Sequence, residues 1–450
     1  MLAIVTPEEM GAIDRAAPEP VEVLIDRAGA ATARAALALL GGAYGRRVTV
    51  LVGKGHNGDD GRAAAHRLRR RGVRCAVLGP DDRPDEVGPC DLVVDAVLGT
   101  GFRGGYRAPR VPSGVPVLAV DIPSGVDGLT GEASEQVLAA TATVTFAALK
   151  PGLVLHPGAA LAGRVEVADI GLDTSSARAH LVTDDDVAGW LPERPVDAHK
   201  WRSAVWVVAG SPGMTGAAHL AARAAQRGGA GYVRLSSPGV VDDPRRPTEA
   251  VGVALPADDW AREVLDGLDR FRALVVGPGL GRDPGTAAQV RRLVAAAPVP
   301  VLVDGDGLTA LGDDPAAVLA ERTAPTVLTP HDGEHAGLTG AAPGPDRLAA
   351  ARALAAATGA VVLLKGPTTV VAGPDGAVLV TATGDARLAT AGTGDVLSGL
   401  GGALLASGLD PLRAAAVAAH LHGRAGAVGS ARGLVAGDLV DHLPLVLDRR

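Results

Sequence analysis

The feature that most restricts the fold of this chain is a repeated alternation of short apolar runs with Ala-rich helical stretches. The apolar runs are rich in β-branched residues and are bounded by Gly or Pro. Such runs are typical of parallel strands that are buried on both faces of a sheet. They fall at 48–53, 75–79, 91–99, 115–123 and 142–149, and then at 204–210, 232–237, 273–279, 299–306, 325–330, 360–366 and 369–373.

A polar stretch, DTSSARAH, separates the two series of predicted strands. A chain of 450 residues is also too long for one ordinary core. We therefore predict a Rossmann-like three-layer α/β unit over 1–172, a linker over 173–180 and a larger α/β domain over 181–450. The first unit should open with two helices within residues 3–40, the first of them capped by Thr6 with Glu9.

Composition and charge exclude several classes of partner. The net charge is −7 and no basic stripe is interleaved with aromatic residues, which argues against nucleic acid. Charges lie where a signal peptide would have its apolar core, and no 18-residue apolar run predicts a membrane span. Cys75 and Cys90 give neither a disulfide framework nor metal-ligand spacing. We expect a cytoplasmic protein.

The first half places Gly, Asp and Ser at three predicted strand ends. The segment VLVGKGHNGDDGRAAAHRL reads as strand, Gly-rich turn and helix, which suits a phosphate but could equally be only a tight turn. A second Gly-rich turn, DAVLGTGFRGG, and a third strand end, DIPSGVDG, follow. Because ligands of open α/β sheets bind at the carboxyl edge, three such strand ends favour a site.

In that order, VGKGHNGDDG, DAVLGTGFRGG, DIPSGVDG and TFAALKPGL resemble the NAD(P)H-hydrate epimerase domain, over roughly residues 1–172. The resemblance implies a potassium ion bound by Asn57, Asp95 and Ser124, whose oxygen donors suit such a cation. It also implies substrate contacts from Asp121 and from two loops. The loop residues are His56, Asn57, Gly58, Asp59 and Asp60, and Gly99, Thr100, Gly101, Phe102, Arg103, Gly104 and Gly105.

Two features of this half concern its chemistry. Epimerisation at C6 of a hydrated nicotinamide ring requires an acid–base pair, for which we predict Asp121 and Lys150. Only four of the 43 Lys and Arg residues are Lys, so a retained lysine such as Lys150 suggests a role that arginine cannot fill. Asp59 adds a negative charge to the first loop, so its side chain should point away or binding there should be weaker.

The second half contains ATAGTGDVLSGLGGALLASG, in which two glycines bracket Thr393 and Asp395 follows at once. This turn would direct N–H groups and a helix dipole at a phosphate, with a carboxylate beside them. Ribokinase-type kinases use such a helix start, with the aspartate as the base. An aspartate that only favours the helix dipole is the simpler alternative. Lys365, in KGPTT at a strand end, reads as a contact to a nucleotide phosphate.

The ordered motifs HKWRSAVWVVAGSPGMTGAAHLAARAA, VVGPGLG, DGDGL, TPHDGEHAGL, LLKGPTT and ATAGTGDVLSG resemble the ADP-dependent NAD(P)H-hydrate dehydratase domain, over about residues 181–445. The resemblance implies a ribokinase-like fold, magnesium with ADP, and a homo-oligomer. It implies substrate contacts from Ala217, Gly279, His331 and Asp395, and nucleotide contacts from Lys365, Gly366, Pro367, Thr368, Thr369 and Gly394. Lys200 could stand at the site entrance or on the surface.

Taken together, these resemblances predict an enzyme that repairs hydrated NADH and NADPH, small molecules that it would bind together with ADP. The first half would exchange the R and S epimers, and the second would dehydrate the S form. A rival is a ribokinase-like kinase of a vitamin precursor or sugar with a ligand-binding first half. In a further rival, the first half is a non-catalytic interaction domain. Fold alone does not separate these.

Overall fold

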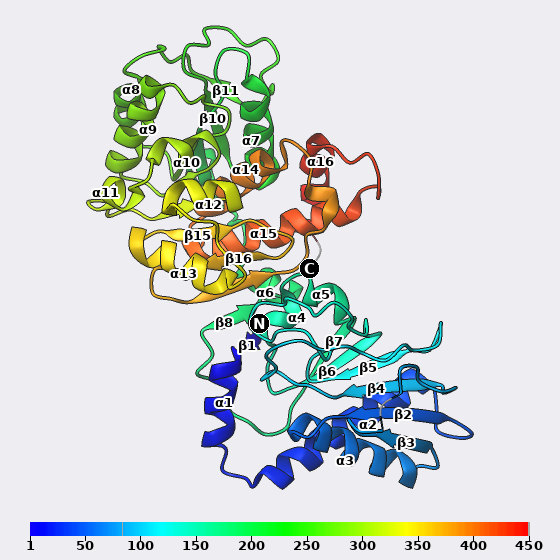
Figure 1. Cartoon of the computed structure of the whole chain (residues 1–450). Helices are drawn as coiled ribbons and strands as arrows, with labels where there is room; N and C mark the ends of the chain where they lie inside the picture. The colour runs from blue at the N-terminus through cyan, green and yellow to red at the C-terminus, as the bar shows by residue number, and fades with distance from the viewer. Residues whose placement is uncertain (83, 449–450) are drawn as a thin grey trace. The chain divides into compact units, whose positions relative to one another are not determined.

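A computed structural model describes residues 1–82 and 84–448 of the chain (Figure 1). It divides into two compact units, Leu2–Ala179 and the segment from His180 onward together with Met1. The division falls at Ala179, within the segment predicted as a linker. No helix among the described residues is long and apolar enough to cross a membrane.

The first unit is built on a parallel sheet in the order β3-β2-β4-β5-β6-β7. Helices α2 and α3 pack on one face, and the extended segments around Val87, Tyr106 and Val111 cover the other. The elements are β1 (Leu2–Ile4), α1 (Pro7–Ala16), α2 (Val21–Leu40), β2 (Arg47–Val52), α3 (His56–Arg70), β3 (Arg74–Leu78), β4 (Leu92–Ala96), β5 (Val117–Val120), β6 (Ala142–Phe146), α4 (Pro151–Val154), α5 (Gly158–Leu161) and β7 (Arg164–Ala168).

The opening helices of this unit agree with the sequence prediction. Thr6 and Glu9 form the expected capping box, with Glu9 N–H donating to Thr6 Oγ1 and Thr6 N–H to Glu9 Oε2. Two backbone hydrogen bonds tie the segment before α1 to the end of β6: Val5 N–H donates to Leu149 O and Leu149 N–H to Ala3 O, both at 2.9 Å. Helix α1 therefore begins close to Lys150.

The second unit has a larger sheet, in the order β8-β17-β16-β15-β14-β13-β12-β9-β10-β11. Its elements are β8 (Ala179–Leu181), α6 (Asp184–Trp190), η1 (Lys200–Ser203), β9 (Ala204–Val208), α7 (Thr215–Arg227), β10 (Tyr232–Ser236), β11 (Val251–Gly252), α8 (Trp260–Asp266), β12 (Ala273–Val276), α9 (Pro284–Ala296), β13 (Val301–Val303), α10 (Asp306–Leu311), α11 (Pro315–Leu319), β14 (Thr326–Leu328), α12 (Asp332–Thr339), α13 (Arg347–Thr358), β15 (Val361–Leu364), β16 (Thr369–Ala372), β17 (Val378–Thr381), η2 (Ala386–Leu388), α14 (Thr393–Ala406), α15 (Pro411–Val428) and α16 (Ala436–Leu447).

The strands from β11 to β15 are parallel, but β16 pairs antiparallel with both β15 and β17. The sequence pattern predicts strands at 360–366 and 369–373 without a direction, and the structure pairs them antiparallel. The physical reason is the short connection KGPT between β15 and β16, which can close a hairpin but cannot cross over to a parallel strand.

The helix that follows the GTGD turn is held very close to its neighbours. One hydrophobic core joins the sheet to four helices, α7, α14, α15 and α16 (Figure 1). A Cβ at Gly399 would lie 2.0 Å from Ala221 O, and one at Gly402 would lie 2.3 Å from Val275 Cγ2. The glycines of SGLGG therefore let α14 approach α7 and the sheet, and this packing fixes where α14 begins.

Candidate active sites

Lys150 and Asp121 form a buried ion pair in the first unit. Lys150 Nζ lies 2.8 Å from Asp121 Oδ1, and it also donates to Thr145 Oγ1 at 2.9 Å and to Phe146 O at 3.1 Å. Only 1% of Lys150 is exposed. A lysine that extends its ammonium to the surface would be exposed, so Lys150 is not of that kind. A buried ammonium requires a partner, and Asp121 provides it.

Asp121 is held in an unusual backbone conformation at the end of β5. Its φ is 66°, in the left-handed region that residues other than Gly rarely adopt. The carboxylate accepts from Thr100 N–H at 2.9 Å and from the Thr100 hydroxyl. Burial alone would raise the pKa of Asp121, but Lys150 and these hydrogen bonds hold it below its usual value. The two predicted strand ends thus meet at one ionised carboxylate.

Asp95 and Ser124, two of the predicted potassium ligands, lie together and are fully buried. Ser124 donates from its hydroxyl to Asp95 Oδ1 at 2.6 Å and from its N–H to Asp95 Oδ2 at 2.9 Å. Ser124 Oγ also accepts from Leu98 N–H, which places the pair against the 99–105 loop. The side-chain oxygens of Asp95 and Ser124 are hard ligand atoms, which an alkali cation prefers.

Asn57, the third predicted ligand, lies against the second loop near Asp121. A Cβ at Gly99 would lie 3.4 Å from Asn57 Cγ and 3.1 Å from Asp121 Oδ2, so Asn57 faces the second loop. Both amide atoms of Asn57 are buried and lack a hydrogen-bond partner within the described residues. Burying an amide without hydrogen-bond partners costs free energy of folding. A cation coordinated by the Asn57 side-chain oxygen would remove part of that cost.

His56 to Asp60, predicted as a loop, form the first turn of α3. A Cβ at Gly58 would lie 2.2 Å from Gly53 O, so this glycine is needed for the tight turn. His56 is exposed. Asp59 pairs with Arg62 Nη1 at 3.0 Å on the helix surface, so the charge that the sequence analysis flagged has a cation beside it.

Asp60 is 8% exposed in the same helical turn. Burial, followed by the charges of Asp121 and Asp59, raises the pKa of Asp60 to about 8. Asp14 of α1 is a site neighbour that the sequence analysis missed: burial chiefly raises its pKa, and Lys150 and Asp121 both act on it. Only the attachment of α1 to β6 brings this residue close, so no local motif could have indicated it.

The second loop is more open than the first. In the described chain, nothing lies within 4 Å of a Cβ built at Gly101, Gly104 or Gly105. Phe102 N–H donates to Gly99 O at 3.0 Å, and Arg103 pairs with Asp127 at 3.3 Å. The loop is therefore unobstructed on the Cβ side of these three glycines.

In the second unit, the GTGD turn begins α14 as predicted. Gly392 has φ 90° and precedes the first helical residue, Thr393. Burial, with the nearby charge of Asp304, raises the pKa of Asp395 to about 6. A raised pKa in the first turn is not what a purely dipole-stabilising aspartate would show, because the helix dipole favours the charged form of the carboxyl.

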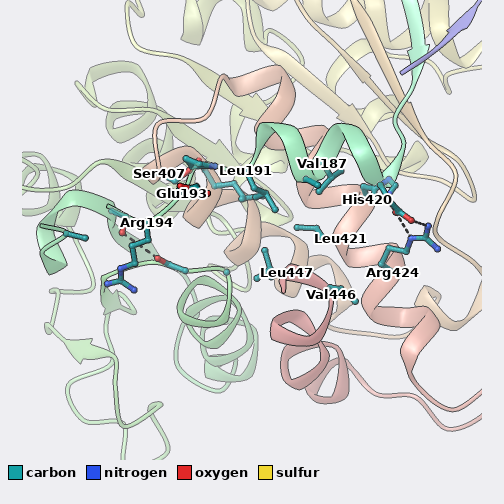
Figure 2. A pocket seen from close by; sticks show the side chains of 18 of the residues that line it. Val187, Leu191, Glu193, Arg194, Ser407, His420, Leu421, Arg424, Val446 and Leu447 are labelled. Atoms are coloured by element: carbon teal, nitrogen blue, oxygen red, sulfur yellow. Dashed lines mark hydrogen bonds and ion pairs between the residues drawn. The ribbon is translucent and has the colours of Figure 1, made fainter. Parts of the chain in front are cut away.

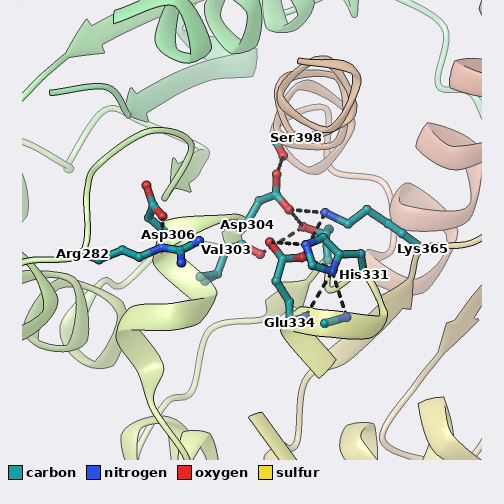
Figure 3. A network of polar contacts seen from close by, with 10 residues as sticks. Arg282, Val303, Asp304, Asp306, His331, Glu334, Lys365 and Ser398 are labelled. Atoms are coloured by element: carbon teal, nitrogen blue, oxygen red, sulfur yellow. Dashed lines mark hydrogen bonds and ion pairs between the residues drawn. The ribbon is translucent and has the colours of Figure 1, made fainter. Parts of the chain in front are cut away.

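Lys365 lies opposite this turn, in a network shown in Figure 3. Its Nζ lies 2.8 Å from Asp304 Oδ1 and 3.4 Å from Glu334 Oε2. Burial would lower the pKa of Lys365, but these two carboxylates raise it above its usual value. A Cβ at Gly394 would lie 3.8 Å from Lys365 Nζ. Asp395, the predicted base, and Lys365, the predicted contact to a phosphate, thus lie at one site.

Asp304 and Glu334 were not assigned roles from the sequence, although the DGDGL and TPHDGE motifs contain them. His331, which was assigned a substrate contact, caps α12: its Nδ1 accepts from Gly333 N–H and Glu334 N–H at 3.0 and 3.2 Å. Its side chain is 59% exposed, so it also has a free face. Asp332 pairs with Arg347 at 2.9 Å.

The remaining predicted residues fall into two groups. Ala217 and Gly279 lie together, since a Cβ at Gly279 would be 3.1 Å from Ala217 Cβ. Gly366, Pro367, Thr368 and Thr369 form the hairpin after Lys365 and start β16, with Thr368 buried and Gly366 close to Arg347. Lys200 precedes β9 and stacks on Trp201 and Tyr232, at the amino edge of the sheet rather than at the site.

A cavity of about 930 Å³ lies in the second unit, away from this chemistry (Figure 2). Its lining includes Leu404 and Ser407 at the end of α14, and Val187, His420 and Leu447 from other helices. Asp395 begins the same helix, so about two helical turns or more separate the two places along α14. None of the predicted site residues lines this cavity, and we do not assign the reaction to it.

The second unit is thus a ribokinase-like α/β domain with a phosphate-binding turn, and the first is a Rossmann-like parallel-sheet domain, as predicted. Family models match both: residues 205–445 match the NAD(P)H-hydrate dehydratase family, and 21–87 and 78–152 match the YjeF-related protein N-terminus. The chain belongs to the family of bifunctional NAD(P)H-hydrate repair enzymes.

Curated members of that family align over most of the chain. The bifunctional NAD(P)H-hydrate repair enzyme of Moorella thermoacetica is 39% identical, over 99% of this chain and 96% of its own length. That of Mycobacterium tuberculosis is 42% identical, over 84% of this chain and 82% of its own. Among solved structures, the ADP/ATP-dependent NAD(P)H-hydrate dehydratase of Bacillus subtilis, co-crystallised with ATP/Mg2+, is 33% identical with a TM-score of 0.52 and covers 59% of this chain and 97% of its own.

Proposed function

We propose that this chain repairs hydrated NADH and NADPH by two reactions, epimer exchange in the first unit and nucleotide-dependent dehydration of the S form in the second. The observation that carries the proposal is that each unit has its own cluster of buried charged residues. Lys150 and Asp121 form the cluster of the first unit, and Asp395 and Lys365 belong to that of the second. The family membership favours this reading over a kinase with a non-catalytic first half.

Epimer exchange requires hydroxide to leave C6 of the ring and water to return to either face. The ring nitrogen lone pair assists the departure and leaves a planar cation. Lys150 and Asp121 would move the proton, because Lys150 donates and the depressed pKa of Asp121 keeps an acceptor beside it. The open loop 99–105 would leave room for the ring next to this pair.

Potassium would be held by Asn57, Asp95 and Ser124, whose donors and burial fit it. There it would supply positive charge close to the two substrate loops. The ordering of Asn57 and of the Leu98–Thr100 segment would then depend on that ion.

In the second unit, Asp395 would take the proton from the C6 hydroxyl, whose oxygen attacks the terminal phosphate of ADP. AMP leaves, and the C6–O bond to the new phosphate breaks as the ring nitrogen expels it. Loss of a C5 proton then gives NADH or NADPH, so one ADP is converted to AMP and phosphate. N–H groups of the 392–395 turn and Lys365 would offset phosphate charge, and magnesium would arrive with the nucleotide, since Mg²⁺ is commonly held by substrate phosphates.

Product analysis tests the proposal directly. Full-length protein given ADP and the R epimer should form AMP, inorganic phosphate and reduced nicotinamide in equal amounts. A stable phosphorylated product would instead support the small-molecule kinase. The cytoplasmic location and the homo-oligomer predicted from the sequence stay predictions.

A further inference from the structure

Asp304 is the most heavily bonded carboxylate of the second site, although it is not one of the residues assigned from the sequence. It follows β13 and is only 3% exposed. Its Oδ1 accepts from Lys365 Nζ at 2.8 Å and from Thr329 Oγ1 at 2.7 Å, and its Oδ2 accepts from Ser398 Oγ at 2.8 Å (Figure 3).

These three donors come from three different elements. Thr329 follows β14, Lys365 follows β15, and Ser398 lies in α14, three residues after Asp395. Ser398 lies one turn into α14 and also contacts Gly394 O at 3.0 Å, so it connects the start of α14 to the sheet edge that carries Lys365. A Cβ at Gly394 would lie 3.7 Å from Asp304 Oδ2, so the catalytic turn itself runs alongside this carboxylate.

The main chain of Asp304 is also fixed. A Cβ at Gly277 would lie 1.9 Å from Asp304 O, and Asp304 N–H donates to Val276 O at 3.1 Å. Small shifts of this carboxylate are thus resisted by the neighbouring strand. Asp304 thus links two groups with different roles, the Lys365 ammonium that would contact the phosphate and the carboxylate of Asp395 that would act as the base.

The charged groups around Asp395 are of both signs. Asp304 and Asp306 disfavour its ionisation and Lys365 favours it. Glu334 faces Lys365 from α12, and Asp306 is paired with Arg282 at 2.9 Å. His422 of α15, whose Nε2 lies 2.9 Å from Thr393 O, has its pKa lowered to about 4 by burial, so it is neutral at neutral pH.

We propose that Asp304 is a positioning residue for the phosphoryl transfer: it holds the Lys365 ammonium and, through Ser398, the turn bearing Asp395 at a fixed separation. Its negative charge also keeps Asp395 a stronger base than an exposed aspartate would be. The proposal rests on the role of Asp395 proposed above, and Asp304 itself does not touch the reacting atoms.

The test is the pH profile of ADP-dependent dehydration by full-length Asp304→Asn, with S epimer as substrate. Asn keeps the shape and can still accept from Ser398 or Thr329, but it lacks the charge. We expect kcat to fall about ten-fold or more, less than the 10²–10⁴-fold typical of losing a general base. The acid limb of kcat should move to lower pH, because Asp395 loses a repelling neighbour while Lys365 loses its counter-ion.

Two further variants separate charge from packing. Thr329→Val removes one hydrogen bond to the same carboxylate and keeps its charge, so its acid limb should stay in place. Ser398→Ala breaks the link to α14 and should lower kcat with little change in KM for ADP; it also provides a test if Asp304→Asn does not fold. An unmoved acid limb in Asp304→Asn, or an unchanged kcat in Ser398→Ala, would overturn the inference. Full activity of Asp395→Asn would instead refute the underlying proposed function.

Discussion

Lys150 Nζ and Asp121 Oδ1 lie 2.8 Å apart, with only 2% of the lysine side chain exposed. Asp121 adopts a left-handed backbone conformation at this point, and Thr100 from the neighbouring strand end holds its other oxygen. The pair is therefore built by two strand ends and the start of α4, and Lys150 Nζ and both carboxylate oxygens of Asp121 have partners.

Replacing Lys150 by Ala should strongly slow epimer exchange, because the C6 hydroxyl that leaves the ring loses its proton donor. The expected loss is about 10²-fold or more. The same protein should still dehydrate purified S epimer with ADP, which is the internal control for folding of the second unit. R epimer should then accumulate unrepaired; unchanged exchange would remove Lys150 from the mechanism.

Asp395→Asn should stop nucleotide-dependent recovery of reduced nicotinamide, because the attacking hydroxyl keeps its proton. Binding of ADP, measured by calorimetry, should change little, since Lys365 and the turn N–H groups remain. Epimer exchange by the same variant should be normal. Substantial recovery of NADH would show that another group is the base.

The pH dependence of dehydration should show an acid limb near the pKa of about 6 for Asp395. The base must be ionised to accept a proton, so the rate should fall as pH drops below that value and level off above it. Rates of S-epimer dehydration at saturating ADP across this range measure it. A limb close to the usual aspartate value of about 4 would contradict the burial argument.

Asp60→Asn should stabilise the first unit at alkaline pH. The pKa of Asp60 is raised to about 8 in the folded state. The contribution of this carboxyl to stability is therefore fully present below the pKa that it has in the unfolded chain, and it is lost as pH rises through about 8. Without potassium, the free energy of unfolding of the variant should exceed that of the parent at high pH by about 2 kcal/mol or more, and the two should match near pH 4. Asp26→Asn, at the exposed ion pair with Arg67, is the matched control and should change little.

Potassium should support the first unit through Asn57. Replacing potassium by lithium or choline should slow epimer exchange and lower the unfolding midpoint of the parent protein. Asn57→Ala should show neither response, because the buried amide oxygen is gone. Equal responses in parent and variant would place the ion elsewhere.

The sequence alone determined the class of fold and the family of this protein. Alternating apolar strands and helices, and glycines at strand ends, are local patterns, and the order of the motifs is specific enough to identify both domains. The Thr6 cap, strands β2 to β6 of the first sheet and the helix start at Thr393 follow from the same local signals, whereas β7 was not predicted.

Only the tertiary structure decided which of these residues act on one another. Asp14 reaches the first site because backbone pairing of residues 3–5 with Leu149 ties α1 next to Lys150. Asp304 bonds Lys365, 61 residues further along the chain, and Ser398, 94 residues further along. The antiparallel β16 likewise depends on a hairpin that periodicity does not register. Burial and the distances between charges set the proton affinities of Asp60 and Asp395, and both arise only when distant segments pack together.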